Sequence, residues 1–374
     1  MLDVRSTHVS LLLISLLLTS SGCVLDWSGA RPYIAVLDAA PPDAAPPDAP
    51  RGDLDAGPDR SLADFPRLMP DVFVPPGPWT DVPAGTFKMG SPSSEPCREV
   101  VAFTGKETLH GVTLTHAFEL NKYEVITKQY MAVMSYSPFS SPFPALPVVN
   151  LSWHEAVSYC NALSDRMGLP RCYHNVGSGE SCNLTSGCTA TDEVCILATM
   201  QCTKYAATST YAGSKLYSCP GYRLPTEAEW EHAYRANTTS AYYNDKTSDP
   251  KVCMTCSELD AAADSIAQYC ANSGSYLRPP KTKLPNAWDL YDMAGNAAEW
   301  CHDGYMSDLG SAAVVDPVGS ATANDKIVRG GNYGDYAALT RAAARSSEPA
   351  QDRINGLGLR CARTTDLPAP DAGP

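Results

Sequence analysis

Cysteine is the residue type in this chain with the widest chemical capacity. The 374 residues include 14 cysteines, and a thiol can form a disulfide, bind a soft metal or take part in redox exchange. CMTC at 253–256 has the C-x-x-C spacing. Outside a thioredoxin-like strand-to-helix context that spacing is a weak redox signal, so we predict structural pairing of these cysteines. By contrast, 302–360 contains no cysteine.

Six further cysteines crowd into an insertion at 172–219. They are Cys172, Cys182, Cys188, Cys195, Cys202 and Cys219. Six cysteines allow many alternative pairings, and the sequence does not choose among them. A zinc cluster is the alternative, but the spacing lacks paired C-x-x-C knuckles. We therefore expect three disulfides, which would replace a core in a segment that has few large apolar residues.

Two helices are expected to position the chemically active groups. The segments 151–168 and 225–234 both place apolar residues at helical spacing. Their first turns contain capping boxes, formed by Ser152 with Glu155 and by Thr226 with Glu229. His154 and His232 are interpreted as helix-surface or structural residues, because no His-Glu-x-x-His or similar metal-binding pair occurs.

Short strands are expected within 79–91 and 110–125, where apolar and β-branched residues alternate with turn residues. The region from about 237 to 364 reads as loop-rich with short strands. Such long irregular stretches need crosslinks, metals or a functional reason.

Composition limits the classes of partner. The chain is 44% hydrophobic and 18% charged, with a net charge of -13, which is typical of a globular protein. So negative a chain has little to neutralise phosphates with, which argues against a nucleic-acid partner.

The N-terminus has the pattern of a bacterial lipoprotein signal. Arg5 precedes the apolar run LLLISLLL at 11–18, and TSSGC ends at Cys23. We expect 1–23 to be a signal peptide, with Cys23 lipidated and the chain anchored to a membrane outside the cytoplasm. Plain secretion is the alternative, and disulfides persist in either location.

Pro, Ala and Asp dominate the next segment, 24–77, which we interpret as a disordered tether. One domain at 78–364 and a disordered tail at 365–374 complete the expected organisation.

Seven sequence blocks occur in a fixed order through this domain. They are FKMGS (87–91), KYEVITKQY (122–130), PVVNLSWHEAVSYC (147–160), GYRLPTEAEWEHAYR (221–235), PNAWDLYDMAGNAAEW (285–300), VRGGNYG (328–334) and LGLRCA (357–362). In these blocks the chain resembles the formylglycine-generating enzyme family, also called the sulfatase-modifying factor family. The resemblance implies an α+β, C-type-lectin-like fold, rich in loops, with disulfides and calcium.

The resemblance implies one calcium site. Its ligands would be the side chains of Asp292 and Glu299 and the carbonyls of Gly295 and Ala297. Two carboxylates with carbonyls on a tight glycine-containing loop suit calcium, which prefers hard oxygen ligands. Alternatively, Asp292 caps a turn and Glu299 pairs with an arginine such as Arg329. For a second calcium loop, Asn272 is only a weak candidate.

The family also pairs a helix cysteine with one near the C-terminus, which here implies a Cys160–Cys361 disulfide. A further family disulfide would fall at Tyr234 and near Ala342, where both cysteines are absent. Cys301 is interpreted as structural.

The family's catalytic mechanism does not carry over to this chain. Authentic members bind copper(I) through two cysteines just after the RGG block and oxidise a sulfatase cysteine to formylglycine. Here Asp335 lies near the first of those positions and 338–340 near the second. Carboxylate, methyl and hydroxyl groups do not replace the soft thiolates that Cu(I) requires. Copper and catalytic residues are therefore not expected.

These observations predict a non-catalytic or chemically divergent, calcium-stabilised binding module on a cell-envelope lipoprotein. The predicted ligand groove contains Trp300, Asp335, Tyr336 and Arg341, and its ligand would be a peptide, a glycan or another envelope component. For Arg345 we expect a buried salt bridge. The alternative is an oxidase with a non-standard copper site. An iron enzyme of the sulfoxide-synthase type would need a helical domain with three histidines, which this sequence lacks.

Overall fold

The computed structural model describes residues 77–98, 106–136, 138, 143–178 and 203–367. The expected signal peptide, most of the tether, the C-terminal end of the tail and the middle of the cysteine-rich insertion lie outside the described residues. In the described part, no helix is both long enough and apolar enough to cross a membrane.

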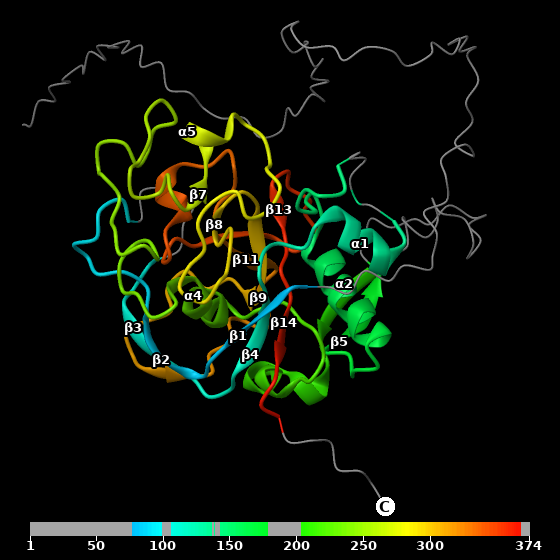
Figure 1. The fold of residues 1–374 in the computed structure, drawn as a ribbon. Coiled ribbons are helices and arrows are strands. Elements are labelled where there is room, and N and C mark those ends of the chain that lie inside the picture. Colours follow the sequence, from blue (N-terminus) through cyan, green and yellow to red (C-terminus); the bar gives the residue numbers. More distant parts are fainter. Residues whose placement is uncertain (1–76, 99–105, 137, 139–142, 179–202, 368–374) are drawn as a thin grey trace, which may run out of the picture. The chain divides into compact units, whose positions relative to one another are not determined.

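A mixed four-stranded sheet lies at the centre of the fold (Figure 1). Its strand order is β12 (Ser346–Pro349), β11 (Asp325–Arg329), β9 (Ala298–Gly304) and β13 (Leu357–Gly358). β11 is antiparallel to both β9 and β12, whereas β13 runs parallel to β9. Every residue of β9 is buried. The polar side chains of its sequence AEWCHDG must therefore find hydrogen-bond partners inside the protein.

Smaller sheets surround this one. One has the order β1 (Trp79–Val82), β4 (Phe118–Asn121) and β14 (Ala362–Thr364). Another has the order β10 (Val314–Val315), β3 (His110–Leu114) and β2 (Gly85–Met89). Two further pairs are β5 (Tyr173–Ser178) with β6 (Thr203–Ala207), and β7 (Ala267–Gln268) with β8 (Ala294–Gly295). The strands expected within 79–91 and 110–125 are therefore present.

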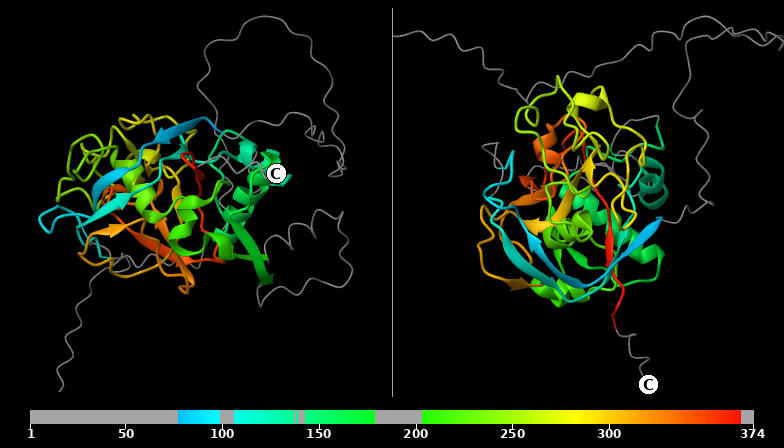
Figure 2. Two further views of the ribbon diagram at one scale, coloured as in Figure 1. Left: turned by 90° about the horizontal axis from the view of Figure 1, so that it is seen from below. Right: turned by 60° about the vertical axis from the view of Figure 1, so that its left-hand side comes forward.

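The α-helices of the described part are α1 (Thr127–Met134), α2 (Trp153–Arg166), α4 (Glu227–Arg235) and α5 (Cys270–Ser273). The 3-10 helices of the described part are η2 (Ser209–Tyr211), η3 (Gly213–Ser218) and η4 (Ala337–Thr340). Both predicted capping boxes are confirmed: each N-cap hydroxyl accepts the N3 backbone N–H at 3.2 Å. α1 and α2 lie on one side of the described domain, and β2 and β3 on the other (Figures 1 and 2).

Two hydrophobic clusters form the core. One surrounds Trp230 of α4, and the other contains Trp153 of α2 together with Trp300 of β9. Buried arginine–carboxylate pairs lie inside the fold, both between residues close in the sequence and between distant segments. Arg223 contacts Glu229 at 2.6 Å, and both side chains are almost fully buried. Pairs of this kind satisfy polar groups that an irregular backbone leaves inside the fold.

Candidate functional site

The segment that follows β11 is filled by small and paired side chains. Gly330 and Gly331 have positive φ angles of 91° and 66° and turn the chain toward η4. Along 337–344 the structure buries five alanines: Ala337, Ala338, Ala342, Ala343 and Ala344. The family resemblance places the first copper-binding cysteine near Asp335, just before this run of alanines, and the second within the run, near 338–340. Methyl groups there form part of the packed interior and provide no ligand.

A disulfide packs against this segment. Cys97 and Cys253 are bonded at 1.99 Å and form a small buried cluster with Ala338. The Ala338 N–H donates to the Cys253 carbonyl at 3.0 Å. The sulfur atoms in this cluster are therefore oxidised and cannot act as a thiolate pair for Cu(I).

The two cysteines of CMTC are both structural, as predicted. Cys253 pairs with Cys97, and Cys256 pairs with Cys270 at 2.01 Å. Neither cysteine bonds to the other, so the C-x-x-C spacing does not form a redox disulfide here.

Arg341 is a correction to the predicted groove. Its side chain is 1% exposed and donates to Glu95 at 2.6 Å and to Glu107 at 2.7 and 2.9 Å. Although burial alone would lower it, hydrogen bonds and charge from both carboxylates raise the pKa of Arg341 further above its usual range. The guanidinium therefore ties two loops together and faces no ligand.

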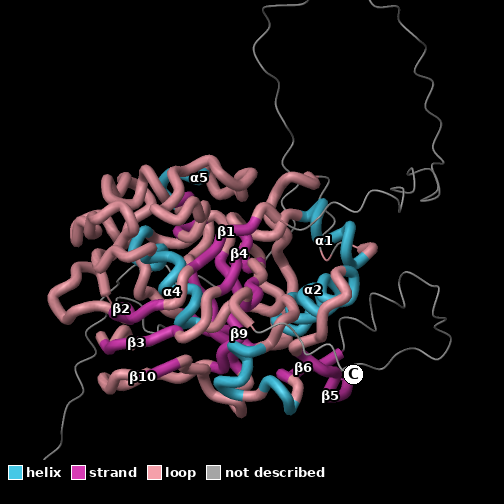
Figure 3. Tube along the Cα trace, turned by 60° about the horizontal axis from the view of Figure 1, so that its bottom comes forward, coloured by secondary structure: helices cyan, strands magenta, loops and turns pink. Residues whose placement is uncertain are grey.

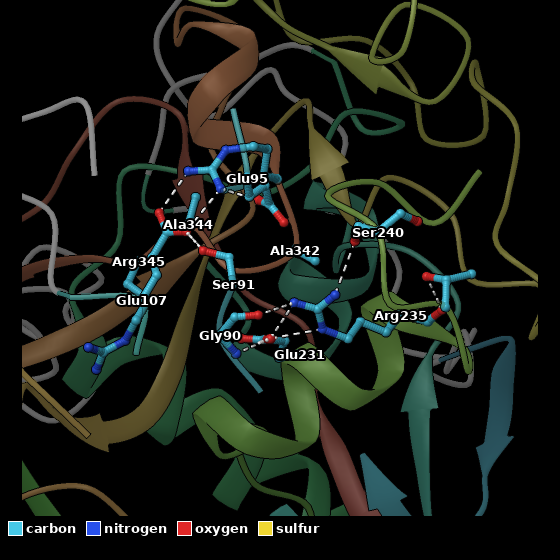
Figure 4. Close-up of polar contacts among 12 residues, drawn as sticks. Gly90, Ser91, Glu95, Glu107, Glu231, Arg235, Ser240, Ala342, Ala344 and Arg345 are labelled. Carbon is cyan, nitrogen blue, oxygen red and sulfur yellow. Dashed lines mark hydrogen bonds and ion pairs between the residues drawn. The ribbon is translucent and has the colours of Figure 1, made fainter. Parts of the chain in front are cut away.

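The neighbouring polar groups follow the same pattern (Figure 4). Arg345 is buried and pairs with Glu227, as expected from the sequence. Glu231 accepts the Gly90 N–H at 2.8 Å and also pairs with Arg235. The interior beside the RGG block is thus a network of buried ion pairs.

Trp300 is a second correction, because it is fully buried and its Nε1–H donates to the Leu151 carbonyl at 3.0 Å. Asp335 and Tyr336 remain partly exposed. The Asp335 carboxylate accepts the Asn332 N–H at 2.8 Å, and burial raises its pKa to about 6. Of the four groove residues predicted from the sequence, only Asp335 and Tyr336 lie at a surface.

The loop that the resemblance assigns to calcium contributes Asp292 to a pair of buried carboxylates with unsatisfied oxygens, and the distant residue Glu124 contributes the other. Asp292 is 1% exposed, and its Oδ2 accepts the Lys281 N–H at 2.7 Å. Its Oδ1 has no hydrogen-bond partner, and neither does Oε2 of the fully buried Glu124. Burial raises the pKa of Asp292 to about 6; it also raises the pKa of Glu124, and the nearby Asp292 charge adds to that shift. A cation between such oxygens would replace the missing donors.

The other predicted ligands fit less well. Both Glu299 oxygens accept hydrogen bonds from Arg360, at 2.6 to 2.9 Å, and Oε2 also accepts from Trp230 at 2.8 Å. Glu299 thus pairs with an arginine, but with Arg360 and not with Arg329. Among the described residues, no group of three His, Cys, Asp or Glu side chains is arranged to hold a metal ion. Asp292 suits a cation, whereas Glu299 is already neutralised.

Gly295 and Ala297 lie beside these carboxylates. The Ala297 N–H donates to Oε1 of Glu124 at 3.2 Å. Gly295 has a φ of 75°, and a Cβ there would approach the Gln268 carbonyl oxygen to 2.0 Å. Only glycine allows this close approach of two backbones.

Asn272 is not available as a calcium ligand. Its Oδ1 accepts the Tyr269 N–H at 2.9 Å, and its Nδ2 donates to Asp264 and Ala267. Both ends of the side chain therefore already have hydrogen-bond partners at the start of α5.

Cys160 and Cys361 lie next to each other in the core. Their Sγ atoms are 2.9 Å apart and fully buried. A disulfide requires about 2.05 Å, so the structure has two neighbouring thiols, and the bond itself stays a prediction. Cys301 is a separate buried thiol, whose pKa burial raises. The Cys172–Cys219 disulfide closes the insertion; its other cysteines lie outside the described residues.

Glu124 was not predicted from the sequence. It lies in the quoted block KYEVITKQY, where a single acidic residue among apolar neighbours reads as surface. A buried carboxylate that shares a site with Asp292, 168 positions further along the chain, leaves no signal in local spacing.

Short mixed sheets, a few helices and long loops joined by buried ion pairs define an α+β fold of the C-type-lectin-like kind. The chain belongs to the family of the sulfatase-modifying factor enzyme 1-like domain, whose model matches residues 79–365. The fold predicted from the sequence is thereby confirmed.

Curated relatives carry several names. A formylglycine-generating enzyme of Streptomyces coelicolor is 34% identical over 154 residues, which are 39% of this chain and 48% of that protein. "Chaperone protein LppX" of Paenibacillus barcinonensis is 29% identical over 195 residues, which cover 51% and 63% of the two chains. The chain thus spans only about half to two thirds of these two proteins. A formylglycine-generating enzyme of Thermomonospora curvata is 25% identical over 323 residues, covering 80% of this chain and 97% of that protein.

Solved structures share the fold. "Treponema denticola variable protein 1" superposes with a TM-score of 0.57 at 26% identity, covering 77% of this chain and 95% of that chain. PvdO from Pseudomonas aeruginosa has a TM-score of 0.53 at 20% identity, covering 77% and 94%, and shows likeness of fold alone.

Proposed function

We propose that this chain is a cell-envelope lipoprotein whose sulfatase-modifying-factor-like domain binds a ligand and does not oxidise cysteine. The observation that carries the proposal is the packed interior of 337–345. Alanines and Arg341 fill this part of the chain, and a disulfide and two glutamates pack against it, in the region where the family's reaction requires two free thiols. A relative named as a chaperone is consistent with a non-catalytic member of the family.

The test is a direct assay of the reaction. The full chain, oxidised and supplied with calcium, is incubated with Cu(I), oxygen and a Cys-x-Pro-x-Arg peptide, and the peptide mass is measured. We expect no change in mass, while an authentic formylglycine-generating enzyme converts the peptide in parallel. Conversion by this chain would refute the proposal and support the alternative, an oxidase with a non-standard copper site.

Calcium is proposed as a stabilising ion at Asp292. Oδ1 of Asp292 and Oε2 of Glu124 are the unsatisfied oxygens that support it, with carbonyls of Gly295 and Ala297 on the same loop. Calcium would neutralise two buried carboxylates and hold this loop against β7. Glu299 is not a calcium ligand in this proposal, because both of its oxygens already accept hydrogen bonds from Arg360.

The membrane anchor is proposed from the sequence of the N-terminus. The Cys23→Ala variant is expected to lose incorporation of labelled palmitate and to leave the membrane fraction of the host bacterium. Ser21→Ala, two residues away, is the control and should retain both properties. The partner of the domain would then be a peptide, a glycan or another component of the envelope.

A further inference from the structure

A cavity separate from the segment after the RGG block lies where the two described strands of the insertion meet the main domain. Its volume is about 360 Å³, within the range of sites for small organic ligands. β5 and β6 lie beside α2 (Figure 3), and the loop 318–324 forms the opposite wall. The cavity therefore exists only because the insertion packs against the family fold.

Lys326 supplies a charge to this cavity. Its Nζ lies 4.3 Å from the centre of the Trp153 ring, in cation–π geometry. Within the described part of the chain, Lys326 forms no salt bridge. Burial lowers the pKa of Lys326, and the negative charge of Asp303 offsets part of that shift. The Asp303 carboxylate, however, already accepts hydrogen bonds from the N–H groups of Glu227 and Gly319, at 2.8 and 2.6 Å. Lys326 is partly buried, and an ammonium group without a carboxylate partner costs free energy as it leaves water.

Two histidines present further donors. Nδ1 of His154 accepts the Tyr205 backbone N–H at 3.1 Å, so Nε2 carries the proton. The Tyr173 hydroxyl accepts the Leu224 N–H and lies 3.2 Å from Nδ1 of His302. If the hydroxyl proton is donated to that nitrogen, Nε2 of His302 carries the ring proton. Both side chains line the cavity as neutral donors. Burial, with the nearby Lys326 charge, lowers the pKa of His154 to about 4 and that of His302 well below its usual range.

The charge of the lining is opposite to that of the protein. The whole chain has 41 acidic residues and a net charge of -13. Yet the described residues that line this cavity include Lys326, Lys204 and two histidines and not one Asp or Glu. The remaining wall is formed largely by small apolar side chains such as Ala206, Ala321 and Ala350.

We propose that this cavity binds a small organic oxyanion, whose carboxylate, sulfate or phosphate group accepts from Lys326, His154 and His302. The small apolar walls and the volume leave room for a compact body behind the anionic group. The inference does not depend on the proposed function, because the cavity shares none of these residues with the calcium loop or with the segment 330–345.

The test is calorimetric titration of the full chain at constant ionic strength, set with potassium chloride. The probes are inorganic sulfate, inorganic phosphate and benzoate, which separate a free inorganic ion from an organic carboxylate. We expect saturable binding of at least one probe. Lys326→Gln should weaken that binding at least ~10-fold, the size of one lost charge-assisted hydrogen bond.

Lys251→Gln is the matched control, because this lysine is exposed and does not line the cavity. His154→Asn provides a second variant, and melting temperatures identify any variant that fails to fold. The proposal is overturned if no probe binds in a saturable way, if chloride competes as well as the probe, or if folded Lys326→Gln and Lys251→Gln bind equally. These binding experiments and the peptide oxidation assay can succeed or fail independently of each other.

Discussion

The Arg341 network allows the sharpest test of whether the segment after the RGG block is a core or a groove. Arg341→Met removes three charge-assisted contacts of 2.6 to 2.9 Å and leaves Glu95 and Glu107 buried near each other. Removing one partner from a buried ion pair costs about 3–5 kcal/mol, because an uncompensated charge remains inside. We therefore expect the free energy of unfolding at pH 8 to fall by that amount.

The loss should depend on pH. Burial already raises the pKa of Glu95 despite Arg341, and without the guanidinium this pKa rises further. A carboxyl whose pKa is higher in the folded state than in the unfolded state destabilises the fold as pH increases through that range. The variant should therefore recover part of its stability at pH 5, where the buried carboxyls bind protons.

The assay is urea denaturation of the oxidised protein, followed by tryptophan fluorescence at pH 8 and pH 5. Arg171→Met is the matched control, because its pair with Asp165 is exposed and such pairs contribute about 0–1 kcal/mol. A loss below about 1 kcal/mol for Arg341→Met at pH 8 would refute the reasoning. That result would support the prediction from the sequence that Arg341 lines a ligand groove.

Three further predictions concern the calcium loop and the core thiols. Gly295→Ala should destabilise the domain by about 3 kcal/mol or more, or prevent folding, because the new Cβ meets the Gln268 carbonyl; thermal denaturation measures it. Asp292→Asn should raise the melting temperature at pH 8 in a chelator, because the pKa of Asp292 is raised to about 6, and should lower it when calcium is present. The opposite order would exclude a cation at Asp292. Cys160 and Cys361 should be resistant to alkylation in denaturant without reductant, and Cys160→Ala should cost about 2–5 kcal/mol; two alkylated thiols would show that the bond is absent.

Local sequence signals were sufficient for the elements that begin α2 and α4. A hydroxyl at the N-cap and a glutamate three residues later satisfy the first-turn N–H groups wherever the helix lies. Ser152 with Glu155 and Thr226 with Glu229 form these boxes in the structure. The order of the family blocks along the chain likewise predicted the fold, because each block can be identified from its own short stretch of sequence.

Side-chain direction was the part that sequence could not predict. A position after the RGG block does not reveal whether Arg341 faces solvent or two glutamates more than 200 residues earlier in the chain. The resemblance predicted Glu299 as a calcium ligand, but in the structure Glu299 forms an ion pair with Arg360. C-x-x-C spacing suggested pairing for Cys253 and Cys256, and only the packed loops decided their partners.

The sequence by itself determined the family, the helix starts and the absence of the catalytic thiols, because these depend on residue identity and on contacts within a few positions. The tertiary structure alone decided which charges neutralise each other and which remain available. Asp292 with Glu124, and Lys326 with His154 and His302, are brought together from distant segments. Such groups meet only when the chain closes around its core, and burial then makes each unsatisfied charge costly enough to indicate a ligand.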